Sequence, residues 1–241
     1  MLAIFNSIAV ARVRQLVNAV RATIAPYEYV QTCVERGFER FIHRAQEDVR
    51  LIAIVGGFRG DEIVILAKRF AGASFHVFEP VPATAELLRR RFRNNKRVSV
   101  VEAAVSDTNG EAEFQDTNLP GAGSLLQVSA AGCADYGLIV TRAFRVSTVT
   151  LDTYAVEQRI EHFDLMWVDV QGAEALVLAG ATNSLNRTSA VMLEVSSYSL
   201  MYEGAPLLPQ LDATLRRKGF SMVLLGCDPD NGTGNALWVR V

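Results

Sequence analysis

The chain has 241 residues, of which 50% are hydrophobic and 21% are charged, and its net charge at pH 7 is −2. These proportions are ordinary for a globular domain and exclude a chain that is disordered throughout. The balanced charge gives no general attraction to nucleic acid or to an anionic membrane. Three scattered cysteines exclude a disulfide framework and a CxxC zinc site, so we expect a protein of the reducing cytoplasm.

The first 50 residues have a helical pattern. Apolar side chains recur every three to five positions before Pro26, and a second helix is predicted over about 29–45. Arginines interrupt the first apolar run, so no stretch of about 18 apolar residues is present to span a bilayer. We interpret residues 1–50 as a helical leader that caps the main domain or forms a homodimer contact. A peripheral contact of the basic first helix with a membrane surface is the alternative.

From residue 51 to residue 241, short apolar runs alternate with amphipathic stretches, which predicts one doubly wound α/β domain with a parallel sheet. The last two runs are separated by a loop too short for a crossover helix, so they must pair antiparallel. A mostly parallel sheet with such a C-terminal hairpin is the Rossmann-like fold of class I methyltransferases. Strands are predicted at 51–55, 74–80, 98–105, 163–170, 189–195, 220–226 and 236–241, and helices at 61–70, 82–95, 173–181 and 206–219.

A glycine-rich turn follows the first predicted strand. Gly56, Gly57 and Gly60 let the backbone turn tightly and approach a ligand at the start of the next helix. Glu79 follows Gly60 by 19 residues and ends the second strand, where an acidic side chain accepts hydrogen bonds from a ribose diol. Both features indicate a cofactor that contains adenosine. The turn GGFRG lacks the GxGxxG register, and no Tyr-xxx-Lys pair is present, so S-adenosylmethionine is favoured over NAD.

Several motifs occur in order between residue 78 and the last strand. They are FEPVPATAELLRR (78–90), AAVSD and NG (103–110), TLDTY (150–154), VDVQGAEALVLAGA (168–181), LEVSSYSLMYEGAPLL (193–208) and ALWVR (236–240). Together they resemble the FkbM family of S-adenosylmethionine-dependent methyltransferases, and the segment DVQGAE is the most specific part. The resemblance covers the chain from about Leu51 onward and implies methyl transfer to a hydroxyl oxygen.

The resemblance also implies roles for individual residues. The glycine turn would lie under the methionine part of S-adenosylmethionine, Glu79 would bind the ribose, and residues 102–104 would lie along the adenine. The cofactor-binding residues expected on this basis are Gly56, Phe58, Gly60, Glu79, Pro80, Glu102, Ala103 and Ala104.

Two carboxylates are candidates for catalysis. A hydroxyl is a poor nucleophile while it keeps its proton, so a general base within hydrogen-bond reach assists the transfer. Asp169 and Glu194 end the fourth and fifth strands of the predicted sheet and would meet at the cleft. Capping of the next helix is the alternative role for Asp169. Acceptor contacts are expected from Gln171, Glu174, Ser124 and Tyr198, and no residue spacing demands a metal ion.

The glycine turn departs from the family pattern at two positions. Ile54 stands where an acidic residue is usual, and Phe58 stands where Asn is common. Asp61 lies nearby and is a candidate substitute, although helix capping also suits it. The leading hypothesis is methylation of a hydroxyl on a small molecule, a sugar or glycan, or a polyketide. The alternatives are an inactive methyltransferase-like scaffold and an RNA methyltransferase, suggested by the basic run 89–97, although the charge balance counts against nucleic acid.

Overall fold

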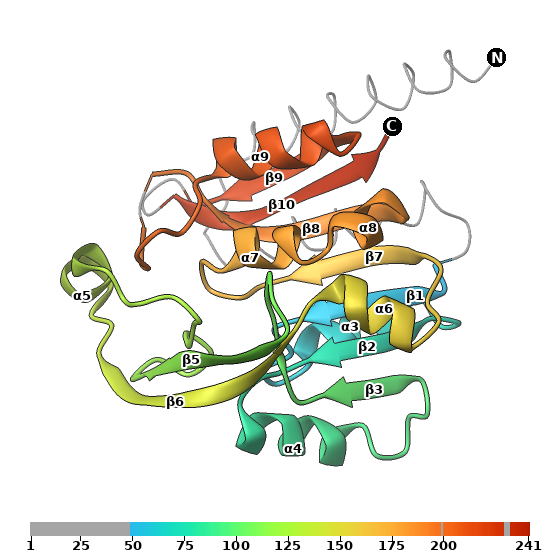
Figure 1. The fold of residues 1–241 in the computed structure, drawn as a ribbon, viewed down its shortest axis with the longest axis horizontal. Coiled ribbons are helices and arrows are strands. Elements are labelled where there is room, and N and C mark those ends of the chain that lie inside the picture. Colours follow the sequence, from blue (N-terminus) through green and yellow to red (C-terminus); the bar gives the residue numbers. More distant parts are fainter. Residues whose placement is uncertain (1–48, 199, 229–231) are drawn as a thin grey trace.

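The computed structural model describes residues 49–198, 200–228 and 232–241. The predicted leader helices lie outside these residues. The described part forms a large sheet covered by helices and a smaller sheet that lies beside it (Figure 1). No helix of the described part is long and apolar enough to cross a bilayer.

The large sheet has seven strands in the order β3-β2-β1-β7-β8-β10-β9. The first five strands of this order pair in parallel, whereas β10 is antiparallel to both β8 and β9. The predicted parallel sheet with an antiparallel C-terminal hairpin is therefore confirmed. The strands are β1 (Leu51–Val55), β2 (Ser74–Phe78), β3 (Val98–Val101), β7 (Phe163–Val168), β8 (Thr188–Ser196), β9 (Phe220–Cys227) and β10 (Thr233–Arg240).

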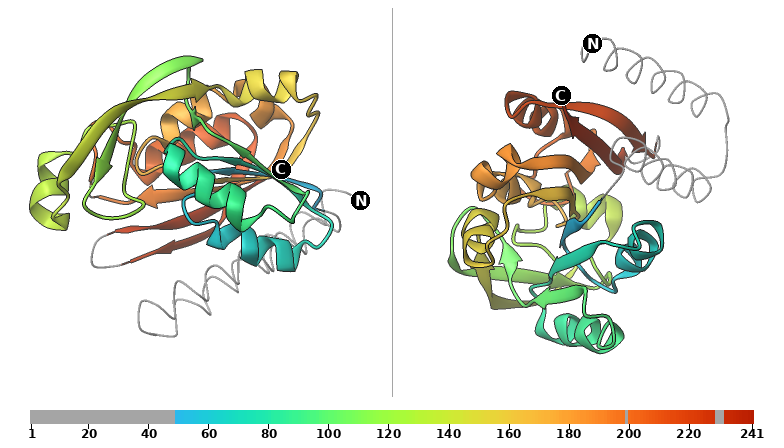
Figure 2. Two further views of the ribbon diagram at one scale, coloured as in Figure 1. Left: turned by 90° about the horizontal axis from the view of Figure 1, so that it is seen from below. Right: turned by 90° about the vertical axis from the view of Figure 1, so that its right-hand side faces the viewer.

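Helices cover both faces of this sheet, as the two views of Figure 2 show. On one face lie α3 (Asp61–Arg69) and α4 (Pro82–Arg91), which bury Ile63, Leu66 and Leu88 against it. The other face is covered by α6 (Leu151–Glu157), α7 (Glu174–Ala179), α8 (Thr182–Asn186) and α9 (Leu208–Arg217). Two apolar layers result, which is why the central strands are apolar on both sides.

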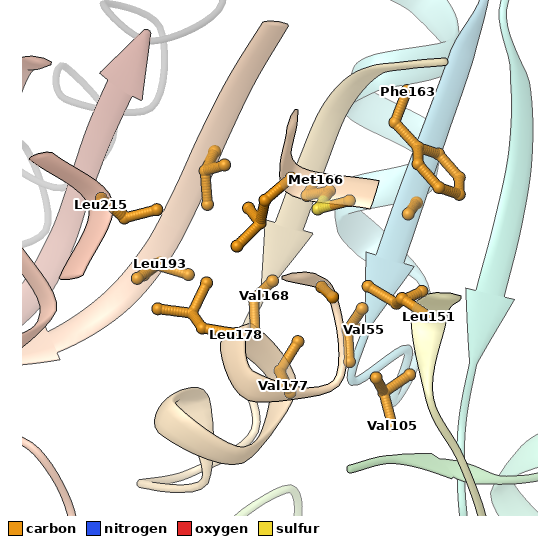
Figure 3. Packing of buried hydrophobic residues seen from close by; sticks show 14 of the residues in the cluster. Val55, Val105, Leu151, Phe163, Met166, Val168, Val177, Leu178, Leu193 and Leu215 are labelled. Carbon is orange, nitrogen blue, oxygen red and sulfur yellow. The ribbon is translucent and has the colours of Figure 1, made fainter. Parts of the chain in front are cut away.

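The central strands are the most deeply buried part of the molecule. In β1 the run LIAIV places Ile52, Ala53 and Ile54 at 0% exposure, because alternate side chains enter opposite layers. Figure 3 shows one layer, where Val55 and Val168 from neighbouring strands meet Val177 of α7. This packing fixes the carboxyl ends of β1 and β7 beside each other.

The smaller sheet is a feature that sequence analysis missed. It consists of β4 (Ala104–Val105), β6 (Val140–Val149) and β5 (Gly110–Thr117), in that spatial order. The expected single strand over 98–105 is wrong, because it divides into β3 of the large sheet and β4 of the small one. The helix α5 (Ala130–Tyr136) lies at the outer end of the β5–β6 arm (Figure 1). Only Phe114, Phe144 and Val146 of this arm pack in a small cluster, so its apolar signal is weak.

The start of β1 is tied to β7 by a single carboxylate. Asp164 Oδ2 accepts hydrogen bonds from the backbone N–H groups of Arg50 at 2.7 Å and Leu51 at 2.8 Å. Its side chain is 14% exposed. A charged acceptor with two backbone donors is a strong interaction, and it sets where β1 enters the sheet.

Replacement of Asp164 tests this tie. Asp164→Ala removes the acceptor of two backbone donors, so we expect it to lower the free energy of unfolding by about 1–3 kcal/mol. Asp164→Asn keeps one acceptor oxygen and should lose less. Urea denaturation measures both variants, and an Asp164→Ala protein as stable as the wild type would contradict the assignment.

Candidate functional site

The candidate site is a cavity of about 360 Å³ at the carboxyl ends of the central strands. Its floor comes from the residues that follow β1, β2 and β7, and β5 with the loop after it forms one wall. This edge of an open α/β sheet is where such folds bind ligands. The lining comprises Val55, Gly56, Phe58, Glu62, Phe78, Glu79, Pro80, Val81, Thr84, Ala103, Ala104, Val105, Phe114, Asp116, Thr117, Pro120, Gly121, Gly123, Leu125, Asp169, Val170, Gln171 and Ala173.

The glycine turn lies between the carboxyl ends of β2 and β7. The backbone N–H groups of Gly56 and Gly57 both donate to the carbonyl oxygen of Phe78, at 3.0 and 3.1 Å. Gly56 has φ 90°, and a Cβ atom there would lie only 1.8 Å from the carbonyl oxygen of Asp169. No side chain fits at this position, so the turn brings bare backbone to the floor of the cavity.

Glu79 holds the turn from the side of β2. Its Oε2 accepts the N–H of Phe58 and its Oε1 accepts the N–H of Val81, both at 2.9 Å. Phe58 has φ 37°, an uncommon conformation for a phenylalanine, and the bond to Glu79 helps to hold it. Burial raises the pKa of Glu79, the two backbone donors oppose this, and the charge of Asp116 adds to the increase. Each carboxylate oxygen retains a lone pair that can accept a ligand hydroxyl.

The lining of the cavity is acidic. Glu62, Glu79, Asp116 and Asp169 line it, and among the described residues no Lys, Arg or His contributes to the lining. Asp116 forms an ion pair with Arg142 at 3.2 Å on the outer side of the wall. Such a cavity favours a ligand that carries positive charge and disfavours phosphate.

The structure explains the departure at Ile54 and shows where its candidate substitute, Asp61, lies. Ile54 is fully buried in the apolar layer against α3. Asp61 does not line the cavity, because it pairs with Arg91 at 2.7 Å on the surface. The neighbouring Glu62, one residue further along α3, lines the cavity instead. No sequence motif indicated this position for Glu62.

Most of the expected cofactor residues meet in this cavity. Gly60 does not line it, since its left-handed backbone conformation begins α3 and packs against Leu88 and Phe92. Glu102 also lies outside, in an exposed ion pair with Arg89 at 2.7 Å. The expected residues that line the cavity are Gly56, Phe58, Glu79, Pro80, Ala103 and Ala104, together with Asp169 and Gln171.

Three of the four expected acceptor contacts lie outside the cavity lining, namely Ser124, Tyr198 and Glu174, and the position of Glu174 is described below. Ser124 is buried, and its hydroxyl accepts the N–H of Leu126 at 3.0 Å, so it shapes the loop after β5. Tyr198 is 59% exposed and is not in the lining. Sequence analysis instead missed Asp116, because the strand β5 that carries it was not predicted. Tyr202 is a buried residue, and its hydroxyl donates to the carbonyl oxygen of Ala122 at 2.6 Å, so it holds the same loop.

Three carboxylates gather around the turn that follows β7. The Nε2 atom of Gln171 donates to Asp169 Oδ1 and to Glu194 Oε2, at 2.7 Å each. Glu174 is 3% exposed, and its Oε1 atom accepts the N–H groups of Val170 and Gly172 at 3.3 Å. Burial, and then the charge of Asp169, raise the pKa of Glu174 to about 7. Glu174 therefore supports the turn from behind, whereas Asp169 faces the cavity.

A pH-dependent stability follows from Glu174. Its pKa is about 7 in the folded protein and 4.5 is its ordinary value, so folding favours the protonated form. The stability that this group contributes is complete below pH 4.5 and is lost as the pH rises through about 7. Between these two pH values the ionisation of Glu174 should lower the free energy of unfolding of the wild type by about 3 kcal/mol. We expect this decrease to be absent in Glu174→Gln.

Urea denaturation across this pH range measures the effect. Glu157→Gln, which replaces an exposed acid at the end of α6, is the control and should follow the wild type. A Glu174→Gln curve parallel to that of the wild type would show that Glu174 is not buried as described.

Comparison with known proteins finds a matching family model and a similar relative. The model of the Methyltransferase FkbM domain matches residues 55–222. The 2-O-methyltransferase NoeI of Sinorhizobium fredii is 34% identical over 148 residues, which are 58% of this chain and 60% of that protein. The chain thus matches less than two thirds of this relative's length.

Among solved structures, the similarity in fold occurs at low sequence identity, and one structure reaches a TM-score of 0.50. The METTL16 methyltransferase domain has a TM-score of 0.50 at 10% identity, over 86% of this chain and 68% of that one. Fibrillarin from Aeropyrum pernix, with natively bound S-adenosyl-L-methionine, has a TM-score of 0.45 at 11% identity, over 80% and 67%. The family match covers more than half of the chain and coincides with the domain that contains the cavity. The chain belongs to the FkbM methyltransferase domain family, whose cofactor is S-adenosylmethionine.

Proposed function

We propose that the protein transfers a methyl group from S-adenosylmethionine to a hydroxyl oxygen of a small molecule, a sugar or glycan, or a polyketide. The observation that carries this proposal is the acidic cavity at the strand ends, within a domain of the FkbM family. Its volume of about 360 Å³ lies in the range of small-molecule sites. The relative NoeI is a 2-O-methyltransferase, which supports oxygen as the methyl acceptor.

The cavity residues fit the parts of S-adenosylmethionine. Glu79 retains lone pairs for the ribose hydroxyls, and the bare backbone at Gly56 admits the methionine part. Phe78, Val81 and Ala104 provide apolar surface for the adenine ring. When bound, this cofactor supplies a methyl group that its positive sulfonium makes electrophilic. The acidic lining suits that positive charge.

Asp169 is placed to act on the acceptor. It lines the cavity beside Gly56, and Gln171 fixes one of its two carboxylate oxygens. The other oxygen can accept the proton of an acceptor hydroxyl, which would make that oxygen a better nucleophile. The wall formed by Pro120, Gly121 and Leu125 would select the acceptor, since loops over a cleft commonly do so. The described part of the lining contains acids and no basic side chain, which argues against a phosphate-rich acceptor such as RNA.

Cofactor binding tests the first part of the proposal. Calorimetric titration should detect S-adenosylmethionine binding to the wild type, and Glu79→Ala should weaken it about tenfold or more through loss of charged hydrogen bonds. Glu157→Ala on the surface is the matched control. No binding to folded wild-type protein at millimolar cofactor would contradict the proposed function. Unchanged affinity in folded Glu79→Ala would remove Glu79 from the ribose site.

The role of Asp169 is tested by turnover. Asp169→Asn keeps the size of the side chain but removes the base, so we expect kcat to fall about 100-fold or more with a smaller change in cofactor affinity. Transfer of a labelled methyl group to a panel of sugar and polyketide alcohols provides the assay. An Asp169→Asn protein with wild-type kcat would exclude Asp169 as the base.

A further inference from the structure

An amide bridge joins the two carboxylates that were expected to be catalytic. One nitrogen atom of Gln171 donates to both Asp169 and Glu194 at 2.7 Å, so the two acids lie on either side of a single donor. Among the described residues, no lysine, arginine or histidine forms an ion pair with either acid. Two ionised carboxylates this close, without a cation, would repel each other strongly.

The two acids have different surroundings. Asp169 lines the large cavity, whereas Glu194 lines a separate cavity of about 30 Å³ behind the turn, with Glu174 and Tyr202. Glu194 lies near Asp169 after β7, Glu174 of α7 and Tyr202 after β8. Its pairing partner on the neighbouring strand β10 is the neutral Asn235. Burial first, and then the charges of Asp169 and Glu174, raise the pKa of Glu194 well above its usual value. Burial therefore favours the protonated form of Glu194, whereas Asp169 lines the large cavity.

We propose that Glu194 and Gln171 are positioning residues, and that Glu194 acts as a neutral acid which, with the Gln171 amide, holds ionised Asp169 toward the cofactor's sulfonium. This inference rests on the proposed function. It assigns the two expected catalytic carboxylates different roles, because only Asp169 reaches the large cavity. Glu194 acts through Asp169 and touches neither cofactor nor acceptor.

The arrangement predicts a preference for charged cofactor over neutral product. S-adenosylmethionine carries a positive sulfonium, whereas S-adenosylhomocysteine has a neutral thioether at the same place. A carboxylate held toward that atom stabilises the first ligand and not the second. The ratio of the two dissociation constants therefore reports the charge and orientation of Asp169, and it requires no knowledge of the acceptor.

The experiment measures this ratio by calorimetry at pH 7.5 for the wild type and four variants. Asp169→Asn should lower the preference for S-adenosylmethionine about fivefold or more, because the charge is lost. Glu194→Gln should stay within about twofold of the wild type, since glutamine replaces a neutral acid by a neutral group of the same shape. Glu194→Ala should lower the preference, because Asp169 loses its support. Glu157→Gln is the surface control and should not change it.

Two results would overturn the inference while leaving the proposed function intact. If Glu194→Gln lowers the preference as much as Asp169→Asn does, Glu194 is itself ionised. If folded Glu194→Ala retains the wild-type preference, Glu194 does not position Asp169. Failure of the wild type to bind either ligand is a different result, since it overturns the proposed function and this inference together.

Discussion

The site depends on the close contact between the glycine turn after β1 and the end of β7. Gly56 lies so near the carbonyl oxygen of Asp169 that a Cβ atom would be 1.8 Å away. The same turn donates two backbone hydrogen bonds to Phe78 at the end of β2, and Asp169 donates its own N–H to Val55 at 2.9 Å. These bonds join the ends of three strands, so that Glu79 and Asp169 line one cavity. The burial of the strands supplies the stability, and the turn determines where their ends meet.

The cavity that results concentrates negative charge, which is costly for a folded protein. Carboxylates lie near one another, and no basic side chain of the part of the chain that the structure describes joins them in the lining. Burial raises the pKa of the carboxylates behind the turn. A fold tolerates such an arrangement where backbone donors and amides satisfy the oxygens, as the N–H groups of Phe58 and Val81 do for Glu79. The unfavourable electrostatics become favourable when a ligand brings positive charge.

The large sheet could be predicted from the sequence because its strands are short apolar runs with clear helical separators. The smaller sheet could not, since β5 reads GEAEFQDT and buries only Phe114 and Thr117, so its pattern lacks the periodic apolar signal of a buried strand. That omission hid the position of Asp116 in the cavity lining. Glu79 and Asp169 could be placed because each lies at the end of a predicted strand. Their hydrogen-bond partners could not be predicted. The bridge from Gln171 to Glu194, for example, joins residues 23 positions apart and depends on side-chain geometry.

A crystal structure with S-adenosylhomocysteine tests the central claim most directly, namely that the glycine turn, Glu79 and Asp169 form one cofactor site. The account predicts the ligand in the cavity of about 360 Å³, with ribose hydroxyls hydrogen-bonded to Glu79 and the sulfur atom facing Asp169. A ligand bound elsewhere, or a ribose that makes no contact with Glu79, would contradict it.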